Sequence, residues 1–134
     1  MIIGHQYIKA MIPNQSRVLD LGCGTGELLS QLVTEKQVIG YGIDISFHNV
    51  QACIKQNISV YQGNINEGLK EFSDQSYDVV ILSQTLQEIH NPLFLIDEML
   101  RVGKQVIVSF PNFGHIKARF DLLFGHAPVT KTLP

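Results

Sequence analysis

Three glycines at alternate positions follow an acidic residue near position 20 of the chain. Residues 20–26 read Asp-Leu-Gly-Cys-Gly-Thr-Gly and come directly after an apolar run that predicts a strand. Glycines in this place let the backbone turn sharply and approach a ligand without a Cβ atom in the way. Asp20 would place a carboxylate near that ligand, which suits an amino or sulfonium group and repels a pyrophosphate. The alternative is that Asp20 only accepts hydrogen bonds from the N–H groups of the loop.

The spacing of these glycines departs from two nucleotide-binding patterns. A dinucleotide site has the pattern G-x-G-x-x-G, but here the third glycine comes one residue early and Glu27 occupies the sixth position. A P-loop is excluded because no Gly-Lys-Ser/Thr sequence follows the glycines. The loop therefore indicates a ligand other than NAD, FAD or a nucleoside triphosphate.

A second acid stands where it can meet the sugar of a nucleoside. The run 40–44 closes the second predicted strand with Asp44, and a carboxylate there can accept hydrogen bonds from both ribose hydroxyls. Asn64 follows a third predicted strand, where its amide can both donate to and accept from an adenine edge. Asn64 is also a common turn residue, and this alternative stays open. Together these residues predict a ligand that contains adenosine.

The elements that must position these residues alternate between strands and helices. Strands are predicted at 17–21, 38–43, 59–62, 77–82 and 105–109, the last stopped by Pro111, and helices at 27–36, 46–57, from 91 onward and at about 115–124. Ser46 and Asn91 are the expected N-caps. This alternation predicts an α/β fold with a mostly parallel sheet of order 3-2-1-4-5, helices on both faces and the ligand at the carboxyl ends of the strands.

Helical spacing also predicts which side chains face the sheet. The expected buried faces are Leu28, Leu29, Leu32 and Val33 in the first helix, Phe47, Val50, Cys53 and Ile54 in the second, Leu93, Phe94, Ile96, Met99 and Leu100 in the third, and Ile116, Phe120, Leu123 and Phe124 in the last.

Composition narrows the class of protein further. The chain has 134 residues, which suits a single domain, and its formal net charge of −2 gives no general attraction to nucleic acid. Its two cysteines form no CxxC pair, so neither a metal site nor a disulfide framework is predicted. No signal peptide or run of about 20 apolar residues occurs, so we expect no membrane association and a cytoplasmic location.

The residues described above resemble motifs I to IV of the class I S-adenosylmethionine (SAM)-dependent methyltransferases, with Asp78-Val79-Val80 as the fourth. The resemblance implies a Rossmann-like fold and SAM or S-adenosylhomocysteine as ligand. That family has a seven-stranded sheet, and we expect its final two strands to be missing here. It usually has Asp where this chain has Asn64. The resemblance implies a ligand site made of Asp20, Gly22, Cys23, Gly24, Gly26, Asp44, Ile45, Gly63, Asn64, Ile65 and Ser83.

A narrower resemblance covers residues 16–134. The segments 81–89, 98–103, 108–115 and 127–134, together with Asn91-Pro92, resemble the MetW family of methionine-biosynthesis proteins. The resemblance implies a homoserine O-acyltransferase as partner. It also implies that residues 1–134 form a single SAM-binding domain, the N-terminal two-thirds of a longer protein.

Candidate catalytic residues are few. A hydroxyl acceptor would require a general base, for which His115, Glu88 and His90 follow predicted strands at the ligand end. Each also has a structural interpretation, as a solvated helix face or a loop residue. Ser83-Gln84-Thr85 stands where enzymes that methylate nucleic-acid amines have an Asn/Asp-Pro-Pro-aromatic motif, which argues against DNA as acceptor. Three hypotheses remain: a SAM-binding accessory subunit of homoserine acylation, a small-molecule methyltransferase, and a structural domain with a relict pocket.

Overall fold

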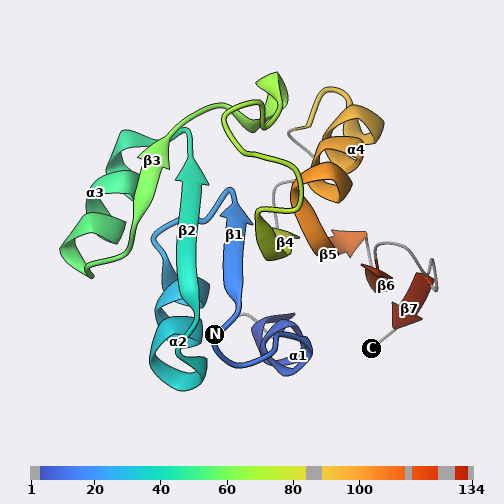
Figure 1. The fold of residues 1–134 in the computed structure, drawn as a ribbon, viewed down its shortest axis with the longest axis horizontal. Helices are drawn as coiled ribbons and strands as arrows, with labels where there is room; N and C mark the ends of the chain where they lie inside the picture. The colour runs from blue at the N-terminus through green and yellow to red at the C-terminus, as the bar shows by residue number, and fades with distance from the viewer. Residues whose placement is uncertain (1–3, 84–88, 114–115, 124–128, 133–134) are drawn as a thin grey trace.

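The structure, a computed structural model, describes residues 4–83, 89–113, 116–123 and 129–132. Helices and strands alternate through most of this length and end in consecutive strands (Figure 1). The elements are α1 (Gly4–Met11), β1 (Arg17–Leu21), α2 (Glu27–Lys36), β2 (Ile39–Asp44), α3 (Phe47–Lys55), β3 (Val60–Gln62), the 3-10 helix η1 (Ile65–Glu67), β4 (Tyr77–Ser83), α4 (Pro92–Val102), β5 (Gly103–Phe113), β6 (Ile116–Leu123) and β7 (Val129–Thr132).

The strands form one sheet of order β3-β2-β1-β4-β5-β6-β7. The first five strands in this order are parallel, which confirms the predicted order 3-2-1-4-5. The sheet order reverses beside β1, because the chain moves outward to β3 on one side and to β4 on the other. In such a sheet the crevice at the carboxyl ends of the strands beside this reversal is where ligands bind.

The C-terminal part of the sheet corrects two expectations. The helix predicted at about 115–124 is instead strand β6, which pairs antiparallel with β5, and β7 pairs antiparallel with β6, so two strands follow the expected five. The sequence from Ile116 to Leu122 alternates apolar with charged residues, and this period of two favours a strand. Strand β5 also continues past Pro111, with a register shift between Phe110 and Phe113 where proline cannot donate to the ladder.

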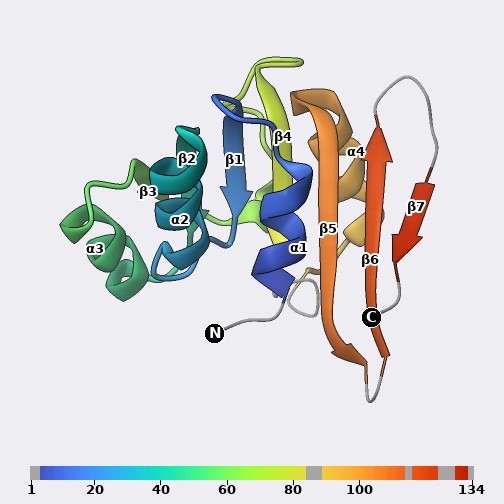
Figure 2. The same cartoon turned by 90° about the horizontal axis from the view of Figure 1, so that it is seen from below.

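Both faces of the parallel strands are covered by helices, as Figure 2 shows. Successive residues of a strand point to opposite faces. Val18, Val79 and Ile81 therefore join one apolar cluster with α1, α2 and α3, and Leu19 and Val80 join another with α4. The sheet is thus a rigid central layer that holds the strand ends, and the loops that follow them, in fixed positions.

The helices bury narrower faces than predicted. Leu93 and Phe94 of α4 are exposed, at 76% and 42% of their surface, whereas Leu95, Met99 and Val102 make up its buried residues. These three residues are spaced four and three positions apart, so they lie on one face of the helix and form the narrow apolar stripe that packs against the sheet. The expected inward positions Phe47 and Ile54 of α3 and Val33 of α2 are likewise exposed.

The predicted helix starts are confirmed. The side chain of Ser46 accepts a hydrogen bond from the backbone N–H of Asn49, and that of Asn91 accepts one from Phe94, with Pro92 as the first residue of α4. Helix α1 is an element that the sequence patterns did not reveal. Within the described ranges, no helix combines the length and apolar character needed to cross a bilayer.

Candidate functional site

The glycine loop between β1 and α2 is built from left-handed backbone turns. Gly22, Gly24 and Gly26 have φ angles of 70°, 61° and 87°, which residues with a Cβ atom rarely adopt. The N–H groups of Gly22 and Cys23 both donate to the carbonyl of Ile43, and the N–H of Gly26 donates to the carbonyl of Cys23. A phosphate-binding loop presents such N–H groups to its ligand, whereas this loop uses them for its own structure.

Asp44 ties the same loop to the end of β2. One carboxylate oxygen, Oδ2, accepts the N–H of Gly24 at 2.8 Å. The other, Oδ1, accepts the N–H of Ser46 at 2.9 Å and the side-chain amide of Asn49 at 3.2 Å. A carboxylate offers about four lone-pair sites, so three donors fix the orientation of Asp44 and leave one site for a ligand hydroxyl. Asp44 is only 8% exposed and is one of the residues that line the pocket.

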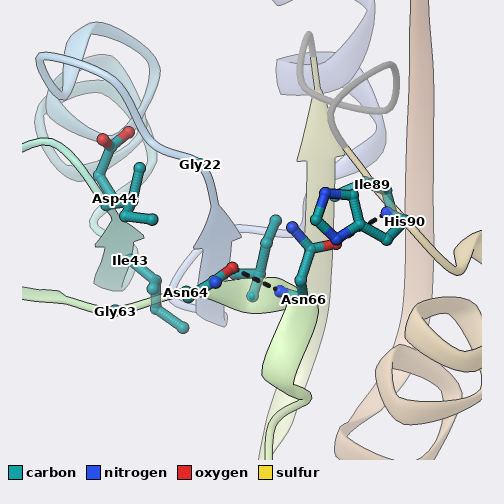
Figure 3. A pocket seen from close by; sticks show the side chains of 10 residues that line it. Gly22, Ile43, Asp44, Gly63, Asn64, Asn66, Ile89 and His90 are labelled. Atoms are coloured by element: carbon teal, nitrogen blue, oxygen red, sulfur yellow. Dashed lines mark hydrogen bonds between the residues drawn. The ribbon is translucent and has the colours of Figure 1, made fainter.

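A pocket of about 270 Å³ lies at the carboxyl ends of β1 and β2. Figure 3 shows Asp44 at one side of it and His90 at the other, with Asn64 and Asn66 between them. This volume is near the lower end of small-molecule sites, which run from about 300 Å³ upward. The lining residues are Gly22, Ile43, Asp44, Ile45, Gly63, Asn64, Ile65, Asn66, Ile89 and His90.

Two asparagines connect the walls of this pocket. Asn64 caps η1 by accepting the backbone N–H of Asn66 at 3.0 Å, so its side-chain NH₂ group is the donor that remains for a ligand. Asn66 in turn accepts the backbone N–H of His90 at 2.9 Å through its Oδ1 (Figure 3). The segment after β3 and the segment that precedes α4 are thus joined by a hydrogen bond between residues 24 positions apart.

Asp20 lies beneath the loop rather than in the pocket. Its side chain is only 2% exposed, and Oδ1 has no hydrogen-bond partner. Burial raises the pKa of Asp20 to about 7, and the negative charge of Asp44 acts in the same direction. The second interpretation, that Asp20 accepts hydrogen bonds from the loop N–H groups, does not account for its Oδ1 atom.

The two cysteines meet under the glycine loop. The sulfur atoms of Cys23 and Cys53 are 3.8 Å apart and both thiols are free. Burial raises the pKa of both thiols, so both stay protonated and behave as small apolar side chains. A Cβ atom on Gly42 would lie 2.6 Å from the sulfur of Cys23, so space between the loop and β2 is tight.

Of the residues predicted for the site, seven line the pocket and the others do not. Gly22, Asp44, Ile45, Gly63, Asn64, Ile65 and the candidate base His90 line it. Asp20, Cys23, Gly24, Gly26 and the buried Ser83 at the end of β4 do not, and their roles remain predictions. Glu88 and His115 fall outside the described residues.

Sequence reasoning missed three lining residues, Ile43, Asn66 and Ile89. Ile43 could have been found, since it directly precedes Asp44 at a strand end, but nothing local marks Asn66 or Ile89. Among the described residues, no three or more His, Cys, Asp or Glu side chains gather in a way that could hold a metal ion.

Comparison with known proteins agrees with this geometry. A curated relative, the bifunctional methionine biosynthesis protein MetXA/MetW of Rhodopirellula baltica, is 38% identical over 125 residues, which is 87% of this chain and 20% of the relative. Among solved structures, a methyltransferase of Haloferax volcanii in complex with the Trm112 methyltransferase activator matches with a TM-score of 0.70 and 24% identity, covering 78% of this chain and 50% of that one.

A SAM-dependent methyltransferase of Thiobacillus denitrificans, solved with S-adenosylhomocysteine, matches with a TM-score of 0.67 and 18% identity, covering 79% of this chain and 47% of that one. These likenesses establish the Rossmann-like methyltransferase fold. The sequence profile of the methionine biosynthesis protein MetW matches residues 3–134, nearly the whole chain. The chain therefore belongs to the MetW family.

Proposed function

We propose that the pocket binds SAM or S-adenosylhomocysteine. The residues present fit the nucleoside part of such a ligand: Asp44 has a lone pair available for a ribose hydroxyl, and Ile45 and Ile65 offer apolar surface to a base. The N–H groups of the glycine loop donate to the chain's own carbonyls, so they are not available to a phosphate. The two nearby acids, Asp20 and Asp44, favour a cationic group over an anionic one. When bound, SAM supplies a methyl group that the sulfonium already activates.

We further propose that the protein acts with a homoserine O-acyltransferase in methionine biosynthesis. The observation that carries this proposal is the Rhodopirellula relative, whose name joins a MetXA part and a MetW part in one chain. We take the MetXA part as the acyltransferase, so that in other organisms the two would associate as separate chains. The match covers a fifth of that relative, so the association with an acyltransferase is proposed for the full-length protein.

The test is to mix the full-length protein with the homoserine O-acyltransferase of the same organism and to measure homoserine acylation with and without SAM. We expect acylation to depend on the protein and its rate to respond to SAM. Linkage requires that the partner then change the affinity for SAM by the same factor. Acylation that is indifferent to the protein would refute the accessory role.

A second candidate function is methyl transfer to a small hydroxyl acceptor. The observation that favours it is the position of His90, which lines the pocket opposite Asp44 and whose backbone is held by Asn66 (Figure 3). A histidine so placed can serve as the general base that a hydroxyl acceptor needs. Incubation with SAM and cell extract, followed by chromatography, should then show S-adenosylhomocysteine, with much less formed by His90→Ala. Absence of turnover in both proteins would favour the accessory role.

We also propose that residues 1–134 act as a single domain of a longer protein. The described strands form one continuous sheet, and the two apolar clusters lie on its opposite faces. Both clusters contain residues of β1, β4 and β5, so both depend on the same strands. Urea unfolding of the full-length protein should show one transition for this region by both fluorescence and circular dichroism. Two separate transitions within it would contradict a single domain.

A further inference from the structure

Two thiols meet where the glycine loop contacts helix α3. Cys23 lies in the loop and Cys53 in α3, 30 positions further along the chain, and their sulfur atoms are 3.8 Å apart. Both thiols are free. The sulfur atoms of a disulfide are about 2.05 Å apart, so an approach of about 1.8 Å would bring this pair to bonding distance.

The two cysteines differ in their access to solvent. Cys53 is fully buried, whereas Cys23 is 8% exposed and directly follows Gly22, which lines the pocket. Burial raises the pKa of both thiols, so they stay protonated and unreactive while the loop is closed. Reaction therefore requires the loop to open locally, and Cys23 is the thiol that a small oxidant then reaches first.

The surroundings of the two sulfur atoms are closely packed. A Cβ atom on Gly42 would lie 2.6 Å from the sulfur of Cys23, and one on Gly26 would lie 3.0 Å from the sulfur of Cys53. The carbonyl oxygen of Gly24 lies 3.7 Å from the first sulfur and 3.4 Å from the second. Close packing leaves these side chains few other rotamers, so most of the approach must come from the loop backbone.

The same stretch of loop is bonded to the end of β2. The N–H of Gly24 donates to Oδ2 of Asp44 at 2.8 Å, and the N–H of Cys23 donates to the carbonyl of Ile43 at 3.0 Å. Moving the loop toward α3 lengthens or bends these hydrogen bonds, which weaken steeply as their geometry departs from the ideal. A cross-link to α3 therefore disturbs the carboxylate of Asp44 at one side of the pocket.

We propose that Cys23 and Cys53 form a reversible oxidation site, at which a disulfide lowers the affinity of the pocket for its ligand. The oxidant is a hydroperoxide. In the open loop the thiol of Cys23 loses its proton and its sulfur attacks a peroxide oxygen, so that an S–O bond forms, the O–O bond breaks and one water leaves. The thiol of Cys53 then loses its proton and its sulfur attacks that of Cys23, so that the S–S bond forms, the S–O bond breaks and a second water leaves. Two thiols are thus oxidised to one disulfide, and one hydrogen peroxide is reduced to two waters.

The ligand and the oxidant act on the same loop. A bound ligand stabilises the closed loop, so it should slow the oxidation. The formation of the disulfide does not depend on the identity of the ligand, whereas its effect on affinity rests on the proposed function.

The first measurement detects the bond itself. Reduced full-length protein is treated with hydrogen peroxide, its remaining thiols are alkylated, and its peptides are identified by mass spectrometry. We expect a pair of peptides joined through Cys23 and Cys53, which dithiothreitol separates again and which forms more slowly in the presence of S-adenosylhomocysteine. Recovery of the two cysteines only as alkylated thiols or as unlinked oxidised residues would overturn the proposal.

The second measurement detects the effect on the pocket. Calorimetric titration with S-adenosylhomocysteine should show an affinity about tenfold lower in the oxidised than in the reduced protein, and dithiothreitol should restore it. A cooperative thermal transition of the oxidised protein checks that it is folded. An unchanged affinity in the cross-linked protein would refute the regulatory effect.

Cys53→Ala is the matched control, because it removes the second thiol and leaves the glycine loop intact. The reduced variant should bind S-adenosylhomocysteine within about twofold of the wild type. Peroxide should lower its affinity less than that of the wild type, since no cross-link can form. An equal loss in Cys53→Ala would assign the effect to oxidation without a cross-link and would overturn the proposal.

Failure of this inference is distinguishable from failure of the proposed function. A reduced wild-type protein that does not bind S-adenosylhomocysteine would refute the proposed function, and with it the effect on affinity. The peptide analysis would still decide whether Cys23 and Cys53 form the disulfide.

Discussion

The two ends of the proposed ligand site differ in how fully their polar groups are hydrogen-bonded. At the proposed nucleoside end, Asp44 accepts three hydrogen bonds from the chain, Asn64 accepts one from Asn66, and Asn66 accepts one from His90. At the opposite end, beneath the glycine loop, Asp20 and His5 are buried with unpaired atoms. The polar groups of the first end are paired without a ligand, whereas the unpaired buried atoms of the second end lower the free energy of unfolding.

This difference has consequences for binding and for stability. A preformed, hydrogen-bonded wall orients a nucleoside with little rearrangement. A buried polar group without a partner lowers the stability of the folded chain until a partner reaches it.

The largest expected effect concerns Asp20. Burial raises the pKa of its carboxyl from the ordinary 3.8 to about 7, so folding favours the protonated form. Between pH 4 and 7 the unfolded chain releases this proton while the folded protein keeps it, and stability falls by about 1.4 kcal/mol per pH unit. Asp20→Asn carries no such proton and should be more stable than the wild type by on the order of 4 kcal/mol at pH 7 and above, relative to their difference at pH 3.5.

Urea unfolding from pH 3.5 to 8 measures this gap. Asp97→Asn, which neutralises an exposed acid on α4, is the control and should show no growing difference from the wild type. The same Asp20→Asn variant should bind SAM more weakly at pH 8, because it lacks the charge that attracts the ammonium group. A gap that does not change with pH would mean that folding leaves the pKa of Asp20 at its ordinary value.

The next effect belongs to the satisfied end. Asp44→Ala removes a charged acceptor worth about 1.5–3 kcal/mol, so affinity should fall about 10- to 150-fold for SAM and 5′-methylthioadenosine alike. Asn49→Ala removes one of the hydrogen bonds to Asp44 but keeps the carboxylate, and should weaken both ligands only about threefold. If Asp44→Ala weakened SAM alone, Asp44 would not contact the nucleoside.

The glycine loop connects the two ends, and its glycines differ in their surroundings. A Cβ atom on Gly24 meets nothing within 4 Å, whereas one on Gly26 would lie 2.7 Å from a methyl of Ile58 and 3.0 Å from the sulfur of Cys53. Both substitutions to alanine carry the strain of a positive φ angle, and Gly26→Ala adds a clash, so it should cost about 1 kcal/mol more. Denaturant unfolding of the two variants measures the difference, and equal costs would show that α3 yields to the added methyl.

The smallest effect concerns the link across the pocket. Asn66→Ala removes the acceptor of the His90 backbone N–H and should lower the affinity for SAM by about 1 kcal/mol or less, which is at most about fivefold. Amide hydrogen exchange provides a direct reading, because the N–H of His90 should exchange faster in the variant. Unchanged exchange at His90 would show that another contact protects it.

Much of the fold follows from local patterns in the sequence. The apolar runs of β1 and β4 and the caps Ser46 and Asn91 depend on neighbouring residues, and their predictions were confirmed. The helix expected at about 115–124 failed because its apolar residues satisfy a helical and an extended period together. Pairing with β5, a contact distant in sequence, decides between the two.

The site divides in the same way. Local sequence patterns predicted the glycine loop, the acid that ends β2 and the turn at Asn64, because turn geometry and strand ends depend on adjacent residues. The three donors to Asp44, the hydrogen bond between Asn66 and His90, and the buried atoms of Asp20 and His5 that lack a partner among the described residues become visible only in the folded chain. Burial and hydrogen-bond pairing depend on groups far apart in the chain, which no local pattern records.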